Sequence, residues 1–314
     1  MLPKNNCQLS IVNCQFLNKK YGTTEALKNI SFEVSKGEIF GLIGPDGAGK
    51  TTLFRILTSL ILADSGTALV DGLDVVKDYS ELRKHIGYMP GRFSLYQDLS
   101  VEENLSFYAT IFNTTIQENY YLIKDIYQQI EPFKHRRAGK LSGGMKQKLA
   151  LSCALIHKPK VLFLDEPTTG VDPVSRKEFW EMLRRLKEDG ITIIVSTPYM
   201  DEANLCDRIA LIQNGQIFSI ETPANIVKQF EKKLYKAESD NNYALLEKFR
   251  KNPQVASAFM FGDSLHVTFN GELTIDNGQW TVSNAGNNCQ LSIVNCQLSE
   301  IQPSIEDCFI GLIK

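Results

Sequence analysis

The sequence predicts an α/β fold that carries a small α+β appendage at its C-terminal end. Two apolar, strand-like runs at residues 39–43 and 161–164 are each followed by residues that bind ligands in open α/β sheets. Beyond Ile220 the pattern changes to short alternating and helical segments. We therefore expect one domain over residues 1–221 and an accessory domain over residues 222–314.

The composition describes an ordinary globular chain. Of its 314 residues 43% are hydrophobic, and a net charge of −2 leaves no basic field for a nucleic-acid partner. The longest apolar stretch, residues 53–63, is interrupted by Arg55 and falls short of the roughly 18 residues that span a bilayer. No signal peptide is evident. We expect the chain to stay in the cytosol unless a partner tethers it to a membrane.

Seven cysteines, an odd number scattered along the chain, argue against a disulfide framework, and no C-x-x-C pair suggests a thiolate metal site. Cys153 lies in an apolar helical run and is predicted to be a core residue. Residues 5–15 recur unchanged at residues 287–297, with an alternation that favours a strand over a coiled coil. The repeat resembles a DNA element read through in frame, and we assign it no paired-cysteine function.

The strongest motif is the glycine-rich loop between the first apolar run and a helix-like run at residues 52–57. It matches G-x-x-x-x-G-K-[ST], a phosphate-binding pattern, and the flanking strand and helix disfavour a chance lysine in a plain turn. Backbone N–H groups and the helix N-terminus attract phosphate, Lys50 reaches the β- and γ-phosphates, and Thr51 ligates Mg²⁺. The loop comprises Gly44, Pro45, Asp46, Gly47, Ala48, Gly49, Lys50, Thr51 and Thr52. Ahead of it, Tyr21 offers an aromatic face for an adenine ring, although a Tyr before a Gly is ordinarily a strand-end residue.

A helical insert is expected at about residues 92–157. Ser100 and Glu103 match the S-x-x-E capping box at the start of a helical pattern. Near the end of the insert, Ser142 and two glycines open a long helix and form a second anion-binding N-terminus. The second apolar run then delivers Asp165 and Glu166 at the carboxyl edge of a buried parallel strand.

Taken in order, these motifs resemble the ATP-binding subunits of ABC transporters, in the exporter or multidrug branch, over roughly residues 10–220. The resemblance implies a P-loop NTPase fold of ABC type, with a mixed sheet core and a helical subdomain, that binds ATP and Mg²⁺. By the same resemblance, Tyr21 and residues 44–52 bind the nucleotide, Thr51 and Asp165 hold Mg²⁺, and Glu166 polarises the attacking water.

The family also implies a head-to-tail dimer. Its signature residues would close over the γ-phosphate of the opposite subunit, followed by the D-loop aspartate; here these are Leu141, Ser142, Gly143 and Gly144, and then Asp172. Two positions depart from the family pattern: Gly91 stands where a Gln is usual, and Pro198 where a His is usual. Met145 in place of Gln is a milder change. Each missing charge-stabilising contact could cost about 10²–10³-fold in rate.

We therefore expect a subunit that binds MgATP but hydrolyses it slowly or not at all in its own site. An intact signature favours a heterodimer with a second ATP-binding subunit over a homodimer. The main interpretation is a peripheral export subunit on the cytoplasmic face of the plasma (inner) membrane, docked on integral membrane permeases. The alternative is a non-hydrolysing nucleotide-binding scaffold or regulatory subunit. A third reading, an ABC-type ATPase acting on DNA or ribosomes, is disfavoured by the single nucleotide domain and the lack of a basic patch.

The accessory domain is predicted from Thr222 and Pro223, which begin a helix through about Lys233. A strand at residues 234–237, a helix at 242–251 capped by Asp240, and a hairpin at 255–269 follow. The end, residues 303–310, resembles the close of the longer exporter-type subunits. A dimer-stabilising or regulatory role and plain packing both remain open for this domain.

Overall fold

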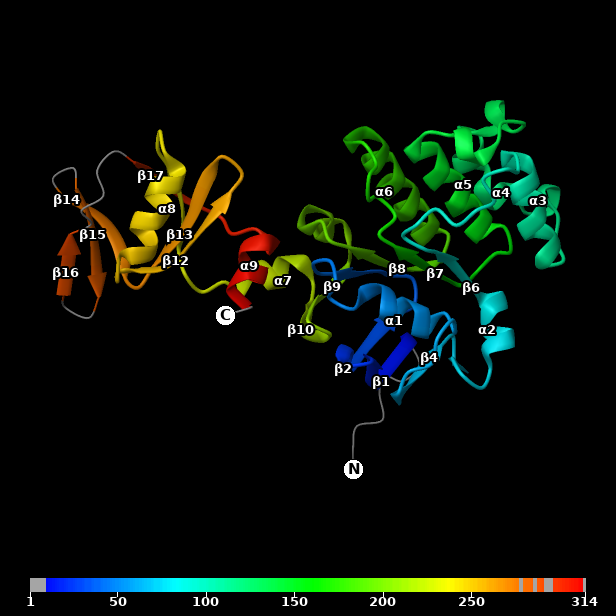
Figure 1. Ribbon diagram of the computed structural model, residues 1–314, viewed down its shortest axis with the longest axis horizontal. Helices are drawn as coiled ribbons and strands as arrows, with labels where there is room; N and C mark the ends of the chain where they lie inside the picture. The colour runs from blue at the N-terminus through cyan, green and yellow to red at the C-terminus, as the bar shows by residue number, and fades with distance from the viewer. Residues whose placement is uncertain (1–9, 277–278, 285–286, 291–295, 313–314) are drawn as a thin grey trace. The chain divides into compact units, whose positions relative to one another are not determined.

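The computed structural model describes residues 10–276, 279–284, 287–290 and 296–312. The chain divides into two compact units, residues 1–223 and 224–314, here called the N-terminal unit and the C-terminal unit. Each is considered by itself (Figure 1). No helix among the described residues is long and apolar enough to cross a bilayer.

An antiparallel sheet begins the N-terminal unit, with strand order β2-β1-β4-β5. Leu27, Ile30, Phe32 and Val34 alternate inward along β2, which places them in one continuous core with β1 and β4. The strands are β1 (Ser10–Tyr21), β2 (Thr24–Ser35), β4 (Ser65–Val70) and β5 (Leu73–Asp74).

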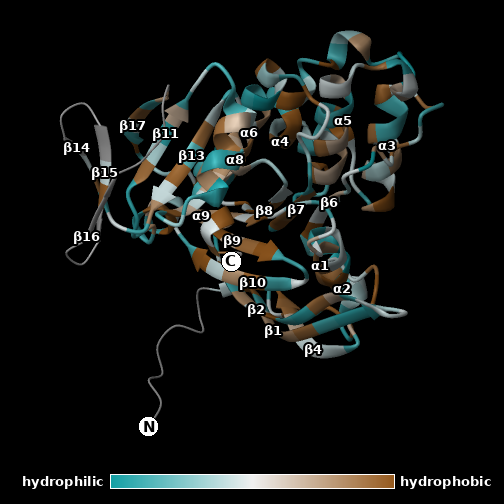
Figure 2. Ribbon diagram, turned by 60° about the vertical axis from the view of Figure 1, so that its left-hand side comes forward, coloured by the Kyte–Doolittle hydropathy of each residue, from teal (hydrophilic) through white to brown (hydrophobic). Residues whose placement is uncertain are grey.

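The second sheet is mixed, with strand order β10-β9-β3-β8-β7-β6. Its strands run parallel except β10, which pairs antiparallel with β9. Every residue of β3, β7 and β8 is buried, as expected of parallel strands covered on both faces. The middle of β9 is hydrophobic in Figure 2. The strands are β3 (Ile39–Ile43), β6 (Ile86–Met89), β7 (Val161–Asp165), β8 (Thr192–Thr197), β9 (Arg208–Gln213) and β10 (Gln216–Glu221).

Helices α3, α4 and α5 form a contacting group between β6 and β7, and the described chain contains no strand there (Figure 1). The predicted capping box of α3 is confirmed, since Ser100 Oγ accepts from Glu103 N and Glu103 Oε2 accepts from Ser100 N. Cys153 is buried in α5, as predicted. The helices are α1 (Lys50–Leu57), α2 (Tyr79–His85), α3 (Val101–Ile111), α4 (Ile116–Tyr127), α5 (Gly143–Leu155) and α6 (Pro173–Glu188), with 3-10 turns at Glu131–Phe133, Ala138–Lys140 and Met200–Leu205.

The C-terminal unit contains an antiparallel sheet of order β12-β13-β11-β17 and another of order β14-β15-β16. The predicted hairpin is confirmed as β12 paired with β13. Helix α8 packs on β12 and β13, and these elements contribute to a hydrophobic core within the C-terminal unit. The elements are α7 (Pro223–Lys228), β11 (Leu234–Glu238), α8 (Asn242–Lys251), β12 (Val255–Phe261), β13 (Ser264–Phe269), β14 (Glu272–Asp276), β15 (Gln279–Asn284), β16 (Asn287–Gln290), β17 (Gln297–Ile301) and α9 (Ile305–Leu312).

Two local predictions in this unit are wrong. Helix α7 ends at Lys228 rather than near Lys233, because the chain must be extended again by the start of β11 at Leu234. The cap of α8 is Asn241, whose side chain accepts from Ala244 N at 3.0 Å, and not Asp240. The sequence could not separate two adjacent residues of similar capping preference.

The strand predicted for the repeat is found only in part. Its first copy enters β1 from Ser10 onward and its second copy begins with β16. Leu9, Leu291 and Ile293, on which the alternation depended, lie outside the described residues.

Candidate functional site

The loop at residues 44–52 joins β3 to α1 and lies close to two neighbouring segments. A Cβ on Gly44 would lie 2.0 Å from the carbonyl oxygen of Ile212, and one on Gly49 would lie 2.5 Å from that of Ala26. Gly49 also has a φ of +107°, in the region that favours glycine. Gly44 and Gly49 therefore leave no room for a side chain. The loop leads into the first turn of α1, whose backbone N–H groups have no partner within the helix.

Lys50 is the buried cation of this loop, with 3% of the residue exposed. Its ammonium donates to the carbonyl oxygens of Gly44 at 2.8 Å and Pro45 at 3.0 Å. It also lies 3.1 Å from Glu166 Oε1. The Lys50 ammonium of the loop and the Glu166 carboxylate that follows β7 therefore form an ion pair.

Asp165 and Glu166 stand at the carboxyl end of β7, beside the end of β8. Asp165 is 2% exposed and accepts from Ser196 Oγ at 2.6 Å. Glu166 has a φ of +50°, a conformation costing of order 1 kcal/mol for a non-glycine residue. Its N–H donates to Ser196 O at 3.0 Å and lies 3.1 Å from Ser196 Oγ, which holds this backbone in place.

A cleft of about 500 Å³ gathers many of the predicted nucleotide-binding residues. Tyr21, at the end of β1, is 49% exposed there, with the Lys19 ammonium 5.6 Å from its ring centre. Thr24, Glu25, Ala26, Lys28 and Asn214 were not predicted from the sequence but line the same cleft. The predicted residues in its lining are Tyr21, Gly47, Ala48, Gly49, Lys50, Thr51, Thr52 and Glu166.

The donor set fits a magnesium ion bound with phosphate. A hydroxyl at Thr51 and a carboxylate at Asp165 are the hard oxygen ligands that Mg²⁺ prefers, and this ion takes only one or two carboxylates beside phosphates. The described residues contain no cluster of three or more His, Cys, Asp or Glu side chains placed to hold a metal alone. A site shared with nucleotide phosphates is consistent with that.

The two positions predicted to depart from the family pattern are Gly91, which borders the carboxylates, and Pro198, which directly follows β8. A Cβ on Gly91 would lie 3.0 Å from Asp165 O and 3.7 Å from Glu166 Cβ. Pro198 follows Thr197, whose carbonyl oxygen accepts from Gly44 N at 3.3 Å. A side chain at Gly91 would therefore begin against the backbone of Asp165, and neither Gly nor Pro supplies a side-chain donor.

The signature residues lie apart from the cleft lining, at the start of α5. Ser142 caps the helix, accepting from Met145 N at 3.3 Å, and Leu141 before it is buried. A Cβ on Gly144 would meet Ser175 Oγ at 3.0 Å, whereas the nearest atom to one on Gly143 is Gly170 O at 3.6 Å. The start of α5 therefore packs beside the start of α6.

Asp172 is the N-cap of α6 and is followed by Pro173 at the first helical position. Its carboxylate accepts from Ser175 N at 3.0 Å. Bonds to the backbone and side chain of Ser175 hold the pKa of Asp172 below its ordinary value. The residue therefore has a structural role within this chain, whatever it contacts in a dimer.

Sequence reasoning missed a buried acid, Glu202, beside the site. It is 2% exposed and accepts from Thr168 Oγ1 at 2.7 Å and Thr197 Oγ1 at 2.6 Å. Arg176 donates to it from Nε and Nη2, and the guanidinium lies 4.3 Å from the Tyr199 ring centre. One carboxylate thus connects the segments after β7 and β8 with α6.

The sequence does contain a signal for the polar residues at the end of β8, Ser196 and Thr197. The apolar residues of β8 end in Ser196 and Thr197, as those of β7 end in Asp165 and Glu166. Because the carboxyl ends of neighbouring parallel strands meet at one edge, both polar pairs belong to one site. The spacing of Glu202 and Arg176 carries no such signal.

These features define a phosphate-binding α/β domain of the nucleotide-binding class, and the comparisons with known proteins give its family. The family model described as "ABC transporter" matches residues 27–169. The "Probable multidrug ABC transporter ATP-binding protein YbhF" of Escherichia coli (strain K12) is 37% identical over 97% of this chain and 52% of that protein. The "Nod factor export ATP-binding protein I" of Rhizobium sp. (strain N33) is 34% identical over 94% of each.

Solved structures agree with the fold. CbiO1 from Clostridium perfringens, "part of the ABC transporter complex cbiONQ", is 29% identical with a TM-score of 0.64, covering 71% of this chain and 93% of that one. The cassette MJ0796, a dimer in a post-hydrolysis state bound to ADP and Pi, is 27% identical with a TM-score of 0.61, covering 67% of this chain and 98% of that one.

The chain belongs to the ABC transporter family and contains its ATPase domain. The predicted fold is confirmed, with a mixed sheet, a helical subdomain and an additional C-terminal antiparallel sheet. The chain spans about half the length of the YbhF proteins that it matches.

Proposed function

We propose that this chain is the MgATP-binding subunit of an export-type ABC transporter and that its own site hydrolyses ATP slowly. One observation carries the proposal. The site keeps its lysine and its two carboxylates, but it has Gly91 and Pro198 at the positions where the family usually has Gln and His. Lys50 and Glu166 lie 3.1 Å apart, while Gly91, beside Asp165, and Pro198, directly after β8, carry no side-chain donor.

The residues of this chain divide the work as follows. Lys50 and the N–H groups at the start of α1 bind the phosphates, and Tyr21 stacks on the adenine. Thr51 and Asp165 hold Mg²⁺, which neutralises phosphate charge when bound. Glu166 would orient a water for attack, and its backbone N–H, bonded to Ser196 O at the end of β8, holds the backbone that presents the carboxylate.

The missing Gln and His remove contacts that would stabilise the transferring phosphate and the water. A single lost donor of this kind costs roughly 10²–10³-fold in rate, and joint losses need not multiply. Leu141, Ser142, Gly143 and Gly144 are intact and would complete a site on another subunit. We therefore favour a second, different ATP-binding subunit over a homodimer.

Permease docking is supported by an apolar groove of about 220 Å³ next to the turn at Pro90. That turn leads directly to Gly91, so a permease segment seated in the groove would press on the carboxylates. The subunit would then sit peripherally on the cytoplasmic face of the membrane. Lining residues include Leu60, Ile86, Met89, Pro90, Leu95, Tyr108, Phe112 and Ala154.

The direct experiment measures MgATP binding and ATPase turnover of the purified chain beside Glu166→Gln. We expect MgATP to bind both proteins and turnover of the wild type to stay within about tenfold of the variant. Failure to bind MgATP would contradict the assigned site. Vigorous turnover that depends on Glu166 would contradict impaired hydrolysis.

The non-hydrolysing scaffold is the second candidate, favoured by the same Gly91 and Pro198. It predicts that the full assembly, whose partner site this chain completes, needs nucleotide bound to this chain but no hydrolysis by it. An ATPase assay of that assembly, with Glu166→Gln or Lys50→Ala placed in this chain alone, separates the two. A hydrolytic subunit predicts lower turnover with Glu166→Gln, whereas the scaffold predicts unchanged turnover with Glu166→Gln and lower turnover with Lys50→Ala.

A further inference from the structure

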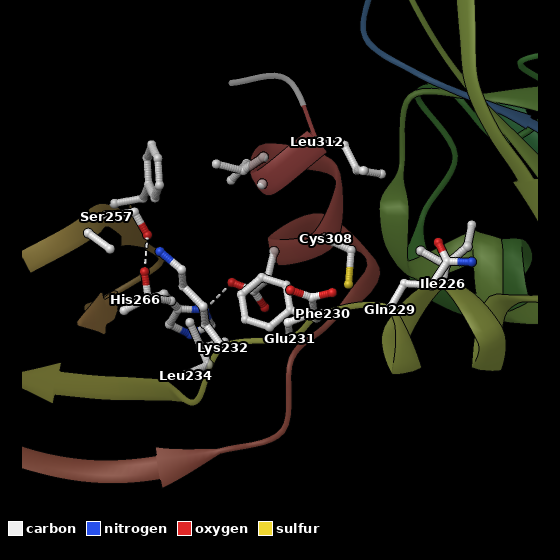
Figure 3. A pocket seen from close by; sticks show the side chains of 16 residues that line it. Ile226, Gln229, Phe230, Glu231, Lys232, Leu234, Ser257, His266, Cys308 and Leu312 are labelled. Atoms are coloured by element: carbon white, nitrogen blue, oxygen red, sulfur yellow. Dashed lines mark hydrogen bonds and ion pairs between the residues drawn. The ribbon is translucent and has the colours of Figure 1, made fainter. Parts of the chain in front are cut away.

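The C-terminal unit contains a pocket of about 300 Å³ that no feature of ATP binding explains (Figure 3). This volume is at the lower end of the range of roughly 300–1,000 Å³ for small-molecule sites. Its walls come from α7, β11, β12, β13 and α9. Apolar lining side chains are Ile226, Phe230, Leu234, Phe259, Ile310 and Leu312.

One end of the pocket carries hydrogen-bond donors. Ser257 Oγ and Thr268 Oγ1 lie 2.6 Å apart, so one hydroxyl donates to the other and the second hydroxyl keeps a hydrogen to give. Figure 3 shows the Lys232 side chain reaching toward this end. Among the described residues no salt bridge involves Lys232. An ammonium and a hydroxyl pair thus line the same pocket.

The acids of the pocket do not compete for this end. Asp307 accepts from His266 Nδ1 at 2.6 Å, and its other oxygen accepts from Ser304 N at 2.8 Å and Ser304 Oγ at 2.6 Å. Its oxygens are therefore already hydrogen-bonded. Glu231 lies on the side of Phe230 and Cys308 in Figure 3, away from Ser257.

We propose that this pocket binds a small apolar anion, with its carboxylate paired to Lys232 and the Ser257–Thr268 hydroxyls and its apolar body against Phe230 and Phe259. A charged hydrogen bond fixes the orientation of such a ligand, and the apolar walls supply the burial. The site is separate from the nucleotide cleft and does not depend on the ATPase function proposed above.

The test uses the full chain and two probes with the same tail, octanoate and octylammonium. Backbone amide NMR titration is expected to show octanoate shifting the signals of α9 and β13, with octylammonium at least about tenfold weaker. Lys232→Gln should weaken octanoate about five- to tenfold. The neighbouring Lys233→Gln, which removes a lysine outside the pocket, should leave its affinity unchanged.

A second variant is designed to fill the pocket from α9. Gly311 lies in α9, and a Cβ there would meet Phe230 Cε2 at 3.6 Å, an ordinary contact distance. Gly311→Leu should abolish octanoate binding while leaving thermal stability equal or higher, since leucine is a better helix former than glycine.

Four results would overturn the proposal. Octylammonium binding as tightly as octanoate would refute the assigned charge. Displacement of octanoate by MgATP would move its site to the nucleotide cleft. Octanoate binding that Gly311→Leu and Lys232→Gln leave intact, or no binding to the wild type, would refute the pocket.

Discussion

At the scale of single residues, Glu202 connects the elements that surround the carboxylates. It receives hydrogen bonds from Thr168, Thr197 and Arg176 in a buried place. A buried acid with several donors is costly to neutralise, because each donor loses a charged partner.

Glu202→Gln should therefore lower the free energy of unfolding by about 2 kcal/mol, the moderate size reflecting the partial exposure of Arg176. Urea unfolding monitored by tryptophan fluorescence measures this, since Trp180 lies buried on α6. Glu188→Gln, an exposed acid at the end of the same helix, is the matched control. Equal stability of both variants would mean that the network contributes nothing.

At the scale of elements, Asp172 begins α6 and has a measurable role in stability apart from any role in a dimer. Asp172→Ala should lower the urea midpoint of unfolding. Asp172→Asn should leave that midpoint close to the wild-type value, because Asn caps a helix about as well as Asp. Any loss of assembly or turnover in Asp172→Asn then reports a contact beyond the cap.

The charge of Asp172 makes part of this effect dependent on pH. Its folded-state pKa lies below the ordinary value of 3.8 because Ser175 hydrogen-bonds the carboxylate. The associated stability is present above the unfolded-state pKa and disappears as pH falls through the folded-state pKa. The difference between wild type and Asp172→Asn should therefore shrink below pH 3.8, and a constant difference would contradict the hydrogen bond.

Several elements could be predicted from the sequence because a local rule decides them. The five buried residues of β7, the capping box of α3 and the β12–β13 hairpin each depend on neighbours within a few positions. The predicted end of α7 was wrong because the chain returns to extended structure for β11, which pairs with distant strands. The predicted cap of α8 was wrong because two adjacent residues have similar capping preference. The links from Glu202 and from Lys50 to Glu166 join distant segments, which only the folded topology brings together.

At the scale of the whole molecule, the two units should respond to different ligands. MgATP at about 100 times its Kd should stabilise the N-terminal unit by about 2.7 kcal/mol and leave the C-terminal unit unchanged. Hydrogen exchange of the full chain, with MgATP added, resolves the two units. Lys50→Ala should lose the protection, and equal protection in both units would contradict a site confined to the first.

The central claim is that this chain binds MgATP while Gly91 and Pro198 limit its hydrolysis. The most direct measurement compares the ATPase rate of the wild type with that of Gly91→Gln/Pro198→His at saturating MgATP, each beside its Glu166→Gln version. We expect the double variant to gain at least about 100-fold in Glu166-dependent turnover. A wild type that already hydrolyses as fast as the double variant would contradict the claim.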